Sequence, residues 1–268
     1  MGKNSESAKA ARRAAQEARA EARAAEQSRD RKVRLIGGVV VVLVMAALLV
    51  PAILKSTAPD VNPNAALPKG ASSETLGIRV GPAWTSANAE VVPTLELWED
   101  FQCPACDQFE KASGSKLDEL VAAGKVRLEY RPTLFLDDNL TAQNTAAGNP
   151  QSSLRATIAF GCAADQDVAQ AFHKAVFAAQ PAQEGTGYSA ADLTAAAQAV
   201  GLAGEKLTNF IECTTNRVYE DWAKNSFDQF TKNGITSTPT AILNGKELTS
   251  DTLFDPAAFE QAILDAAK

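Results

Sequence analysis

The pattern of apolar and polar positions divides the chain into three parts. Residues 35–54 form an uninterrupted segment without a charged side chain, and the segments on either side of it are polar. From residue 76 onward, short alternating apolar stretches are mixed with longer stretches of helical period. This pattern predicts one folded domain, residues 76–268, which follows a separate apolar segment.

Within residues 76–268 the pattern predicts strands and helices in a definite order. Residues 91–99 are rich in Val, Leu and Trp, which favours a strand. Asn244-Gly245 between two apolar runs favours a two-residue hairpin turn. The order is that of an α/β sandwich with a helical insertion at about residues 150–215. The expected strands are 77–80, 91–99, 125–132, 240–243 and 246–249, the expected helices are 103–124, 153–179, 190–200, 204–212, 215–232 and 256–268, and a loop is expected at 136–152.

The apolar segment, residues 35–54, has the length of a transmembrane helix. A helix of about 20 residues covers about 30 Å, the thickness of the hydrocarbon core of a bilayer. Basic residues directly before it place the N-terminus in the cytoplasm. The segment is longer than the apolar core of about 7–15 residues in a cleaved signal peptide, which favours an uncleaved signal anchor, although small residues near its end leave cleavage open. Residues 55–75, rich in Pro, Ala, Ser and Asn, are expected to tether an extracytoplasmic domain.

Charge is distributed unevenly, and this excludes one class of partner. Residues 1–34 hold ten of the 26 basic residues and five of the 32 acidic ones, so the expected cytoplasmic tail is basic. The tail has no apolar stripe, and we interpret it as a solvated segment that sets orientation. The remaining chain has 16 basic and 27 acidic residues. Because such a surface repels phosphates, the domain is not expected to bind nucleic acid.

The candidate reactive motif is Cys103-Pro104-Ala105-Cys106. Two cysteines three residues apart at the start of a helix share one face, and the helix N-terminus stabilises a thiolate there. Cys103 is therefore expected to be accessible and to have a lowered pKa. Cys106, one turn further along, is expected to be more buried and to act as the resolving thiol. An extracytoplasmic location permits disulfide chemistry.

Other interpretations of the motif remain open at the level of the residues. The pair could be half of a zinc site, an inert structural disulfide, or two unpaired core cysteines. The remaining zinc-ligand types, Cys162, Cys213 and the single His173, match no common zinc spacing, so no metal and no cofactor is expected. His173 is expected to be a packed or surface residue of a helix.

Two separated segments resemble one known family. Residues 98–106 resemble the active-site segment of DsbA-like thiol-disulfide oxidoreductases of the thioredoxin superfamily, and residues 234–240 resemble the cis-proline loop of these proteins. The resemblance covers about residues 78–268 and has both motifs in the right order. It implies a thioredoxin fold with a helical insertion. The expected architecture of the chain is this α/β domain preceded by one transmembrane helix, residues 35–54, and it resembles the membrane-anchored bacterial type of the family.

The resemblance also implies roles for single residues. Pro239 would follow a cis peptide bond and lie against the two motif cysteines, and the backbone of Thr238 would bind an extended substrate. Cys162 and Cys213 would form a structural disulfide between two insertion helices. Such a bond closes a loop of about 50 residues and contributes roughly 4 kcal/mol in the loop-entropy model.

Two positions depart from the family pattern. Many relatives have His where this chain has Ala105, so a weaker oxidant is expected. Many relatives also have a buried carboxylate six residues before the first cysteine, where this chain has Leu97. Glu96 and Glu99 are close in sequence, but each is expected to be a solvated strand charge, and the proton-transfer group stays unassigned.

These observations lead to one main hypothesis and two alternatives. The chain is expected to act as a monomer that introduces disulfides into unfolded secreted or cell-envelope polypeptides with free thiols, and a membrane partner is expected to reoxidise it. The first alternative is an extracytoplasmic disulfide reductase or isomerase. The second is a non-catalytic binding module that uses the thioredoxin fold as a scaffold.

Overall fold

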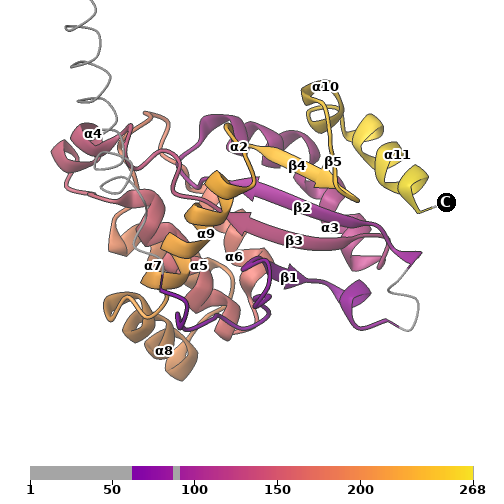
Figure 1. Cartoon of the computed structure of the whole chain (residues 1–268). Coiled ribbons are helices and arrows are strands. Elements are labelled where there is room, and N and C mark those ends of the chain that lie inside the picture. The colour runs from indigo at the N-terminus through magenta and orange to yellow at the C-terminus, as the bar shows by residue number, and fades with distance from the viewer. Residues whose placement is uncertain (1–61, 87–90, 268) are drawn as a thin grey trace, which may run out of the picture. The chain divides into compact units, whose positions relative to one another are not determined.

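A mixed five-stranded sheet forms the centre of the described part of the chain (Figure 1). The computed structural model describes residues 62–86 and 91–267. The strands are β1 (Ile78–Val80), β2 (Thr94–Glu99), β3 (Arg127–Pro132), β4 (Thr240–Leu243) and β5 (Lys246–Glu247). Their order in the sheet is β1-β3-β2-β4-β5, with β2 parallel to β3 and the other neighbours antiparallel. The sequence predicted each of these strands, and β1 lies at one edge of the sheet.

Helices connect and cover the strands in the predicted α/β order. The element sequence of strand, helix, strand, helical block, hairpin and helix confirms the thioredoxin fold. The helices are α2 (Pro104–Phe109), α3 (Ser115–Ala122), α4 (Thr141–Ala146), α5 (Ser152–Asp165), α6 (Ala169–Ala178), α7 (Ala190–Ala199), α8 (Gly204–Thr215), α9 (Glu220–Lys232), α10 (Ser250–Leu253) and α11 (Pro256–Ala266), with a 3₁₀ turn η1 (Pro82–Trp84) and a π-helical turn η3 (Glu110–Gly114).

The strand β2 is buried on both faces because side chains alternate across a sheet. Leu95 and Leu97 point to one face and are fully buried. Trp98 points to the other face, where its ring packs edge-on against Phe230 of α9. Covered on both sides, β2 carries the reactive motif at its end on a rigid support.

The helical insertion lies between β3 and α9 and comprises α4 to α8. It begins at Thr141, earlier than the expected residue 150, because α4 forms within the predicted loop. The single helix expected at 153–179 is two helices, α5 and α6, and the chain turns between them at Asp167, which has a φ of 64°. The central helix α5 packs against α6, α8 and α9. Gly161 in α5 permits one close approach, since a Cβ there would lie 2.9 Å from the ring of Tyr219.

The hairpin between β4 and β5 turns at Asn244 and Gly245. Both have positive φ, 49° and 79°, as a two-residue hairpin turn requires. The strand β5 ends at Glu247 rather than at residue 249. The reason is that the hydroxyl of Thr249 accepts a hydrogen bond from the backbone N–H of Thr252 and so caps α10.

Residues 62–75, the described part of the expected tether, pack against the domain. The backbone N–H of Asn62 donates to Asn225 of α9 at 3.1 Å, and the backbone N–H of Lys69 donates to Asp165 of α5 at 3.0 Å. This part of the expected tether therefore hydrogen-bonds to the domain through its backbone.

The basic tail, the apolar segment 35–54 and residues 55–61 lie outside the described residues. In the part that is described, no helix has the length and apolar character needed to cross a membrane.

Candidate active site

The two motif cysteines lie at the junction of β2 and α2. Cys103 has extended backbone and is the N-cap residue of α2, and Pro104 occupies the first helical turn, where its missing N–H costs no hydrogen bond. Cys106 follows one turn later. Both cysteines are free thiols, Cys106 fully buried and Cys103 7% exposed.

Cys103 is more buried than the sequence indicated, because the loop before β4 covers it. Its thiol donates a hydrogen bond to the backbone carbonyl oxygen of Thr238, with a distance of 3.4 Å between Sγ and O. The Thr238–Pro239 peptide bond is cis. The structure thus brings together the two segments that carried the family resemblance, with Thr238 and Pro239 half-buried beside the reactive sulfur.

The two thiols differ strongly in acidity. Hydrogen bonding from the Cys106 thiol is the largest cause that lowers the pKa of Cys103, to about 6; the Thr238 side chain and backbone N–H groups at the start of α2 act in the same direction, against burial. Burial raises the pKa of the Cys106 thiol well above its usual range. At neutral pH, Cys103 is therefore a nucleophilic thiolate and Cys106 a protonated thiol.

Asp100 directly follows Glu99, the last residue of β2, and holds the loop that leads to the reactive motif. Its carboxyl group accepts hydrogen bonds from the backbone N–H groups of Gln102 and Leu136, both at 2.9 Å, and from the hydroxyl of Ser153 at 2.6 Å. Burial raises the pKa of Asp100 to about 7, against the effect of these donors. With each oxygen hydrogen-bonded, this carboxyl group has a structural role.

The helical insertion also holds the reactive loop in place. The side-chain amide of Gln180 donates to the backbone carbonyl oxygens of Phe101 and Cys103, at 2.9 and 3.1 Å. The hydroxyl of Tyr188 donates to the carbonyl oxygen of Phe101 at 2.9 Å. Sequence reasoning missed Gln180 and Tyr188, since neither lies in a motif and they are 79 and 87 residues from Phe101 along the chain.

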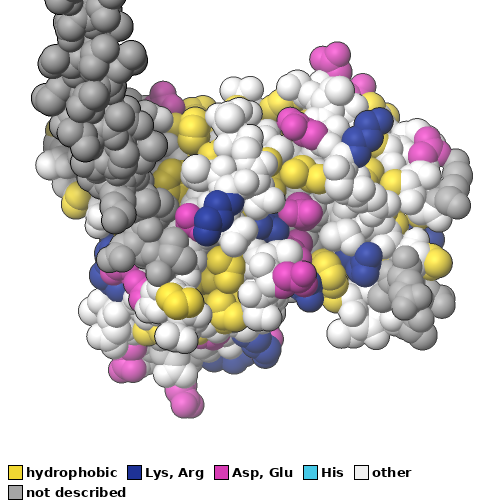
Figure 2. All heavy atoms as spheres, in the orientation of Figure 1, with side chains coloured by type: hydrophobic (Ala, Val, Ile, Leu, Met, Phe, Trp, Pro, Cys, Tyr) yellow, Lys and Arg dark blue, Asp and Glu magenta, His cyan; other side chains and the backbone are white. Residues whose placement is uncertain are grey.

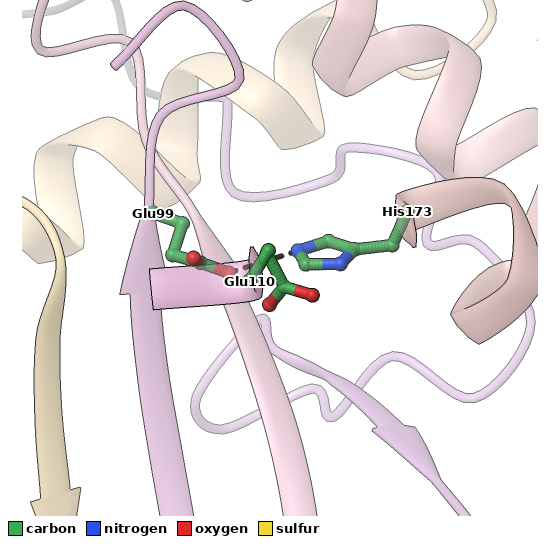
Figure 3. Close-up of side chains that lie close together, drawn as sticks. All are labelled: Glu99, Glu110 and His173. Atoms are coloured by element: carbon green, nitrogen blue, oxygen red, sulfur yellow. Dashed lines mark ion pairs between the residues drawn. The ribbon is translucent and has the colours of Figure 1, made fainter. Parts of the chain in front are cut away.

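Glu99 is buried, and the expectation of a solvated strand charge was wrong for it. Its side chain is 4% exposed, and one carboxyl oxygen lies 2.9 Å from Nε2 of His173 in α6 (Figure 3). Period-two alternation places Glu99 on the same face of β2 as Leu97, and this signal was available in the sequence. Glu96 is half-buried, and its carboxyl group contacts Arg131 at 3.0 Å.

His173 is packed, which is one of the two expected outcomes. Its ring lies among four aromatic rings, and no histidine colour appears on the face shown in Figure 2. Burial lowers the pKa of His173 to about 4 and raises the pKa of Glu99 well above its usual range. These shifts favour a neutral imidazole and a protonated carboxyl group in the buried pair. The surrounding rings are those of Phe101, Tyr130, Phe160 and Phe177.

Glu110, the first residue of the π-helical turn, completes this cluster. Glu99, Glu110 and His173 each offer one atom within 4.8 Å of the others, a spacing that a metal ion could use. Burial raises the pKa of Glu110 to about 7 and the pKa of Glu99 well above its usual range, so ionising both carboxyl groups to balance a cation is costly. The absence of a metal therefore remains our prediction.

The other two cysteines form a disulfide within the insertion. Cys162 of α5 and Cys213 of α8 are bonded, with a Cα–Cα distance of 5.8 Å. Cys162 is fully buried. The bond joins two helices that also pack against each other.

Comparison with known proteins places this geometry in a family. The family model described as thioredoxin matches residues 86–265. No curated protein matches the chain. Among solved structures, DsbA of Mycobacterium tuberculosis is 27% identical with a TM-score of 0.57, covering 71% of this chain and 92% of that one.

Two further structures agree in fold. The disulfide bond oxidoreductase DsbG of Mycobacterium tuberculosis is 26% identical with a TM-score of 0.55, covering 71% of this chain and 86% of that one. The thiol-disulfide oxidoreductase MdbA of Actinomyces oris is 20% identical with a TM-score of 0.59, covering 74% of this chain and 89% of that one. The chain therefore belongs to the thioredoxin family, as a DsbA-like thiol-disulfide oxidoreductase.

Proposed function

We propose that the chain introduces disulfides into secreted or cell-envelope proteins through Cys103 and Cys106. The observation that carries the proposal is the difference in acidity between the two thiols. A Cys103 thiolate stabilised by its neighbours favours the reduced pair and so makes the disulfide form an oxidant. The match to DsbA at 27% identity supports the same direction.

The reaction is a dithiol–disulfide exchange. A substrate thiolate attacks Sγ of Cys103, the Cys103–Cys106 bond breaks, and its electron pair stays on Cys106. A second substrate thiolate then attacks the substrate sulfur of the mixed disulfide and releases Cys103 as a thiolate. The substrate loses two electrons and the cysteine pair gains them. Cys106 resolves mixed disulfides that stall.

The substrate is proposed to bind as an extended chain beside Pro239. Thr238 and Pro239 are half-buried and adjoin Cys103, so backbone groups of this loop lie next to the sulfur that the substrate must reach. Strand-like pairing with backbone groups does not read side chains, which suits unfolded polypeptides with free thiols.

Location and partners complete the proposal. Residues 35–54 would anchor the chain in the cell membrane, with the basic tail in the cytoplasm and the domain outside. A membrane redox partner would accept the two electrons and regenerate the disulfide. The protein would act as a monomer without a cofactor.

The test uses the full-length chain and Cys103→Ser. The wild type should oxidise a reduced substrate protein and the variant should not, because the attacked sulfur is gone. Oxidation that survives the substitution would contradict the proposal. Faster insulin reduction than substrate oxidation would favour the reductase, refolding of scrambled ribonuclease would favour the isomerase, and inertness in all three assays would favour a binding module.

A further inference from the structure

One buried cluster has no part in the exchange described above. Glu99, Glu110 and His173 come from β2, the π-helical turn and α6, and their polar ends point toward one another (Figure 3). Among the described residues, neither carboxyl oxygen of Glu99 has a hydrogen-bond partner, although one of them lies 2.9 Å from Nε2 of His173. Nδ1 of His173 and one carboxyl oxygen of Glu110 also have none. A buried polar atom without a hydrogen-bond partner costs free energy of folding, and a role in the reaction would explain why these atoms are kept.

The cluster lies beneath the helix face that carries Cys106. Cys106 and Glu110 are four residues apart in the chain and so lie on one side of the helical segment. Glu110 begins a π-helical turn, a feature that occurs often at functional sites. Helix α6, which carries His173, packs against α2. The cluster of Glu99, Glu110 and His173 and the buried sulfur of Cys106 thus lie on the same side of the helical segment.

The electrostatic coupling runs in both directions. The charge of Glu99 contributes to the raised pKa of Cys106, after burial and the Cys103 thiol, and the charge of Cys103 contributes to the raised pKa of Glu99, after burial. Glu99 is not among the causes that lower the pKa of Cys103. A neutral Glu99 leaves the Cys103 thiolate stabilised, whereas an ionised Glu99 opposes a negative charge on either sulfur.

We propose that Glu99 is the proton-transfer group for Cys106, and that His173 and Glu110 connect it to solvent. The inference rests on the proposed exchange function. When the Cys103–Cys106 bond breaks, Glu99 gives its carboxyl proton to the Cys106 sulfur, leaving a thiol and a carboxylate. The carboxylate regains a proton through His173 and Glu110. When Cys106 attacks a mixed disulfide, its proton returns to the Glu99 carboxylate.

The route ends near the surface. Glu110 is half-buried, and the pair formed by the exposed Lys174 and the half-buried Asp118 is close enough to act on its pKa. Proton transfer from Glu99 to Cys106 is favourable, because a thiolate of high pKa takes a proton readily from a carboxyl group. The other titratable or charged groups facing the cluster are Cys103 from the start of α2, Tyr130 and Arg131 from β3, Asp118 from α3 and Lys174 from α6.

The test separates the two steps by reacting the reduced full-length chain with oxidised glutathione. Rapid quenching and mass measurement follow formation of the Cys103–glutathione mixed disulfide and its resolution by Cys106. In Glu99→Gln, formation should keep its rate and resolution at pH 7 should slow by about 100-fold, the lower end of what general acid–base catalysis supplies. The resolution rate should then rise with pH, because hydroxide must remove the proton. Glu99→Asp should restore part of the rate.

The matched control is Glu96→Gln, which removes a carboxylate from the other face of the same strand. It should leave both steps unchanged. Should Glu99→Gln fail to fold, His173→Gln and Glu110→Gln should slow resolution without changing formation, and resolution in the wild type should be slower in deuterium oxide.

Three results would overturn the proposal. Resolution at the wild-type rate in Glu99→Gln removes Glu99 from the proton path while leaving the exchange function intact. Stoichiometric zinc in the wild-type chain, lost in Glu99→Gln, would make the cluster a metal site. No mixed disulfide in the wild type would remove the proposed function, and this inference with it.

Discussion

Cys162 and Cys213 close a loop across 51 residues, whereas Cys103 and Cys106 lie one helical turn apart. The first pair is bonded and ties α5 to α8; the second is free, with one acidic thiol and one buried thiol of high pKa. A large loop gives a disulfide much entropic stabilisation and a short loop gives little. The same bond type therefore supports the fold in one region and is free to open in the other.

Removal of the long-loop pair should have the largest effect on stability. Cys162→Ala with Cys213→Ala should lower the free energy of unfolding by about 4 kcal/mol, because the unfolded chain regains the freedom of the open loop. Urea unfolding would measure this. The rate of exchange with glutathione should stay at the wild-type value, and a loss of exchange in the folded variant would contradict the division between the pairs.

The Asp100 network, the carboxyl group with its three donors, should make stability depend on pH. The folded chain holds the Asp100 proton up to about pH 7, and an unfolded chain releases it near pH 4. The unfolded state binds fewer protons between these values, so the contribution of Asp100 to the unfolding free energy should fall by about 3 kcal/mol from about pH 4.5 to about pH 7. Asp100→Asn, which cannot titrate, should remove this part of the slope in urea titrations. An unchanged slope would show that Asp100 titrates normally.

The acidity of Cys103 should be measurable by alkylation. The rate of its reaction with iodoacetamide should rise with a midpoint near pH 6, whereas Cys106, followed in the same mass spectra, should stay unreactive at neutral pH. At pH 7 the lowered pKa stabilises the reduced pair by about 1.4 kcal/mol, which corresponds to about 30 mV. A midpoint at about pH 8.5 would mean that the Cys103 thiol has an ordinary pKa.

An effect of similar size concerns Ala105, which lies between the cysteines. Ala105→His should place a charge beside the Cys103 thiolate at about pH 6 and raise the reduction potential by about 30 mV, the equivalent of one pKa unit. The increase should fade at about pH 8, where imidazole is neutral. Ala105→Gln is the control for size, and an equal increase in this variant would exclude a charge effect.

Most of the fold could be predicted from the sequence, because local signals specify it. The Val, Leu and Trp content identified β2, alternation identified β3, and Asn244-Gly245 identified the hairpin turn. The contacts of Gln180 and Tyr188 with the reactive loop could not be predicted, since they depend on how the insertion packs. The burial of Cys103 has the same origin, because a loop 135 residues away along the chain covers it.

Glu99 is an intermediate case. Its face follows from the alternation with Leu95 and Leu97, but its burial requires α6 to bring His173 over the end of β2. Glu99 lies two residues from the position at which many relatives have their buried carboxylate. Its charge favours an exposed side chain, so its burial is not expected from the sequence.

The reduction potential of Cys103 and Cys106 in the full-length chain tests the central claim most directly. Equilibration with glutathione, alkylation and mass measurement would give it. We predict a value between those of protein disulfide isomerase, about −180 mV, and DsbA, about −120 mV. A value near that of thioredoxin, about −270 mV, would make the protein a reductase and contradict the account.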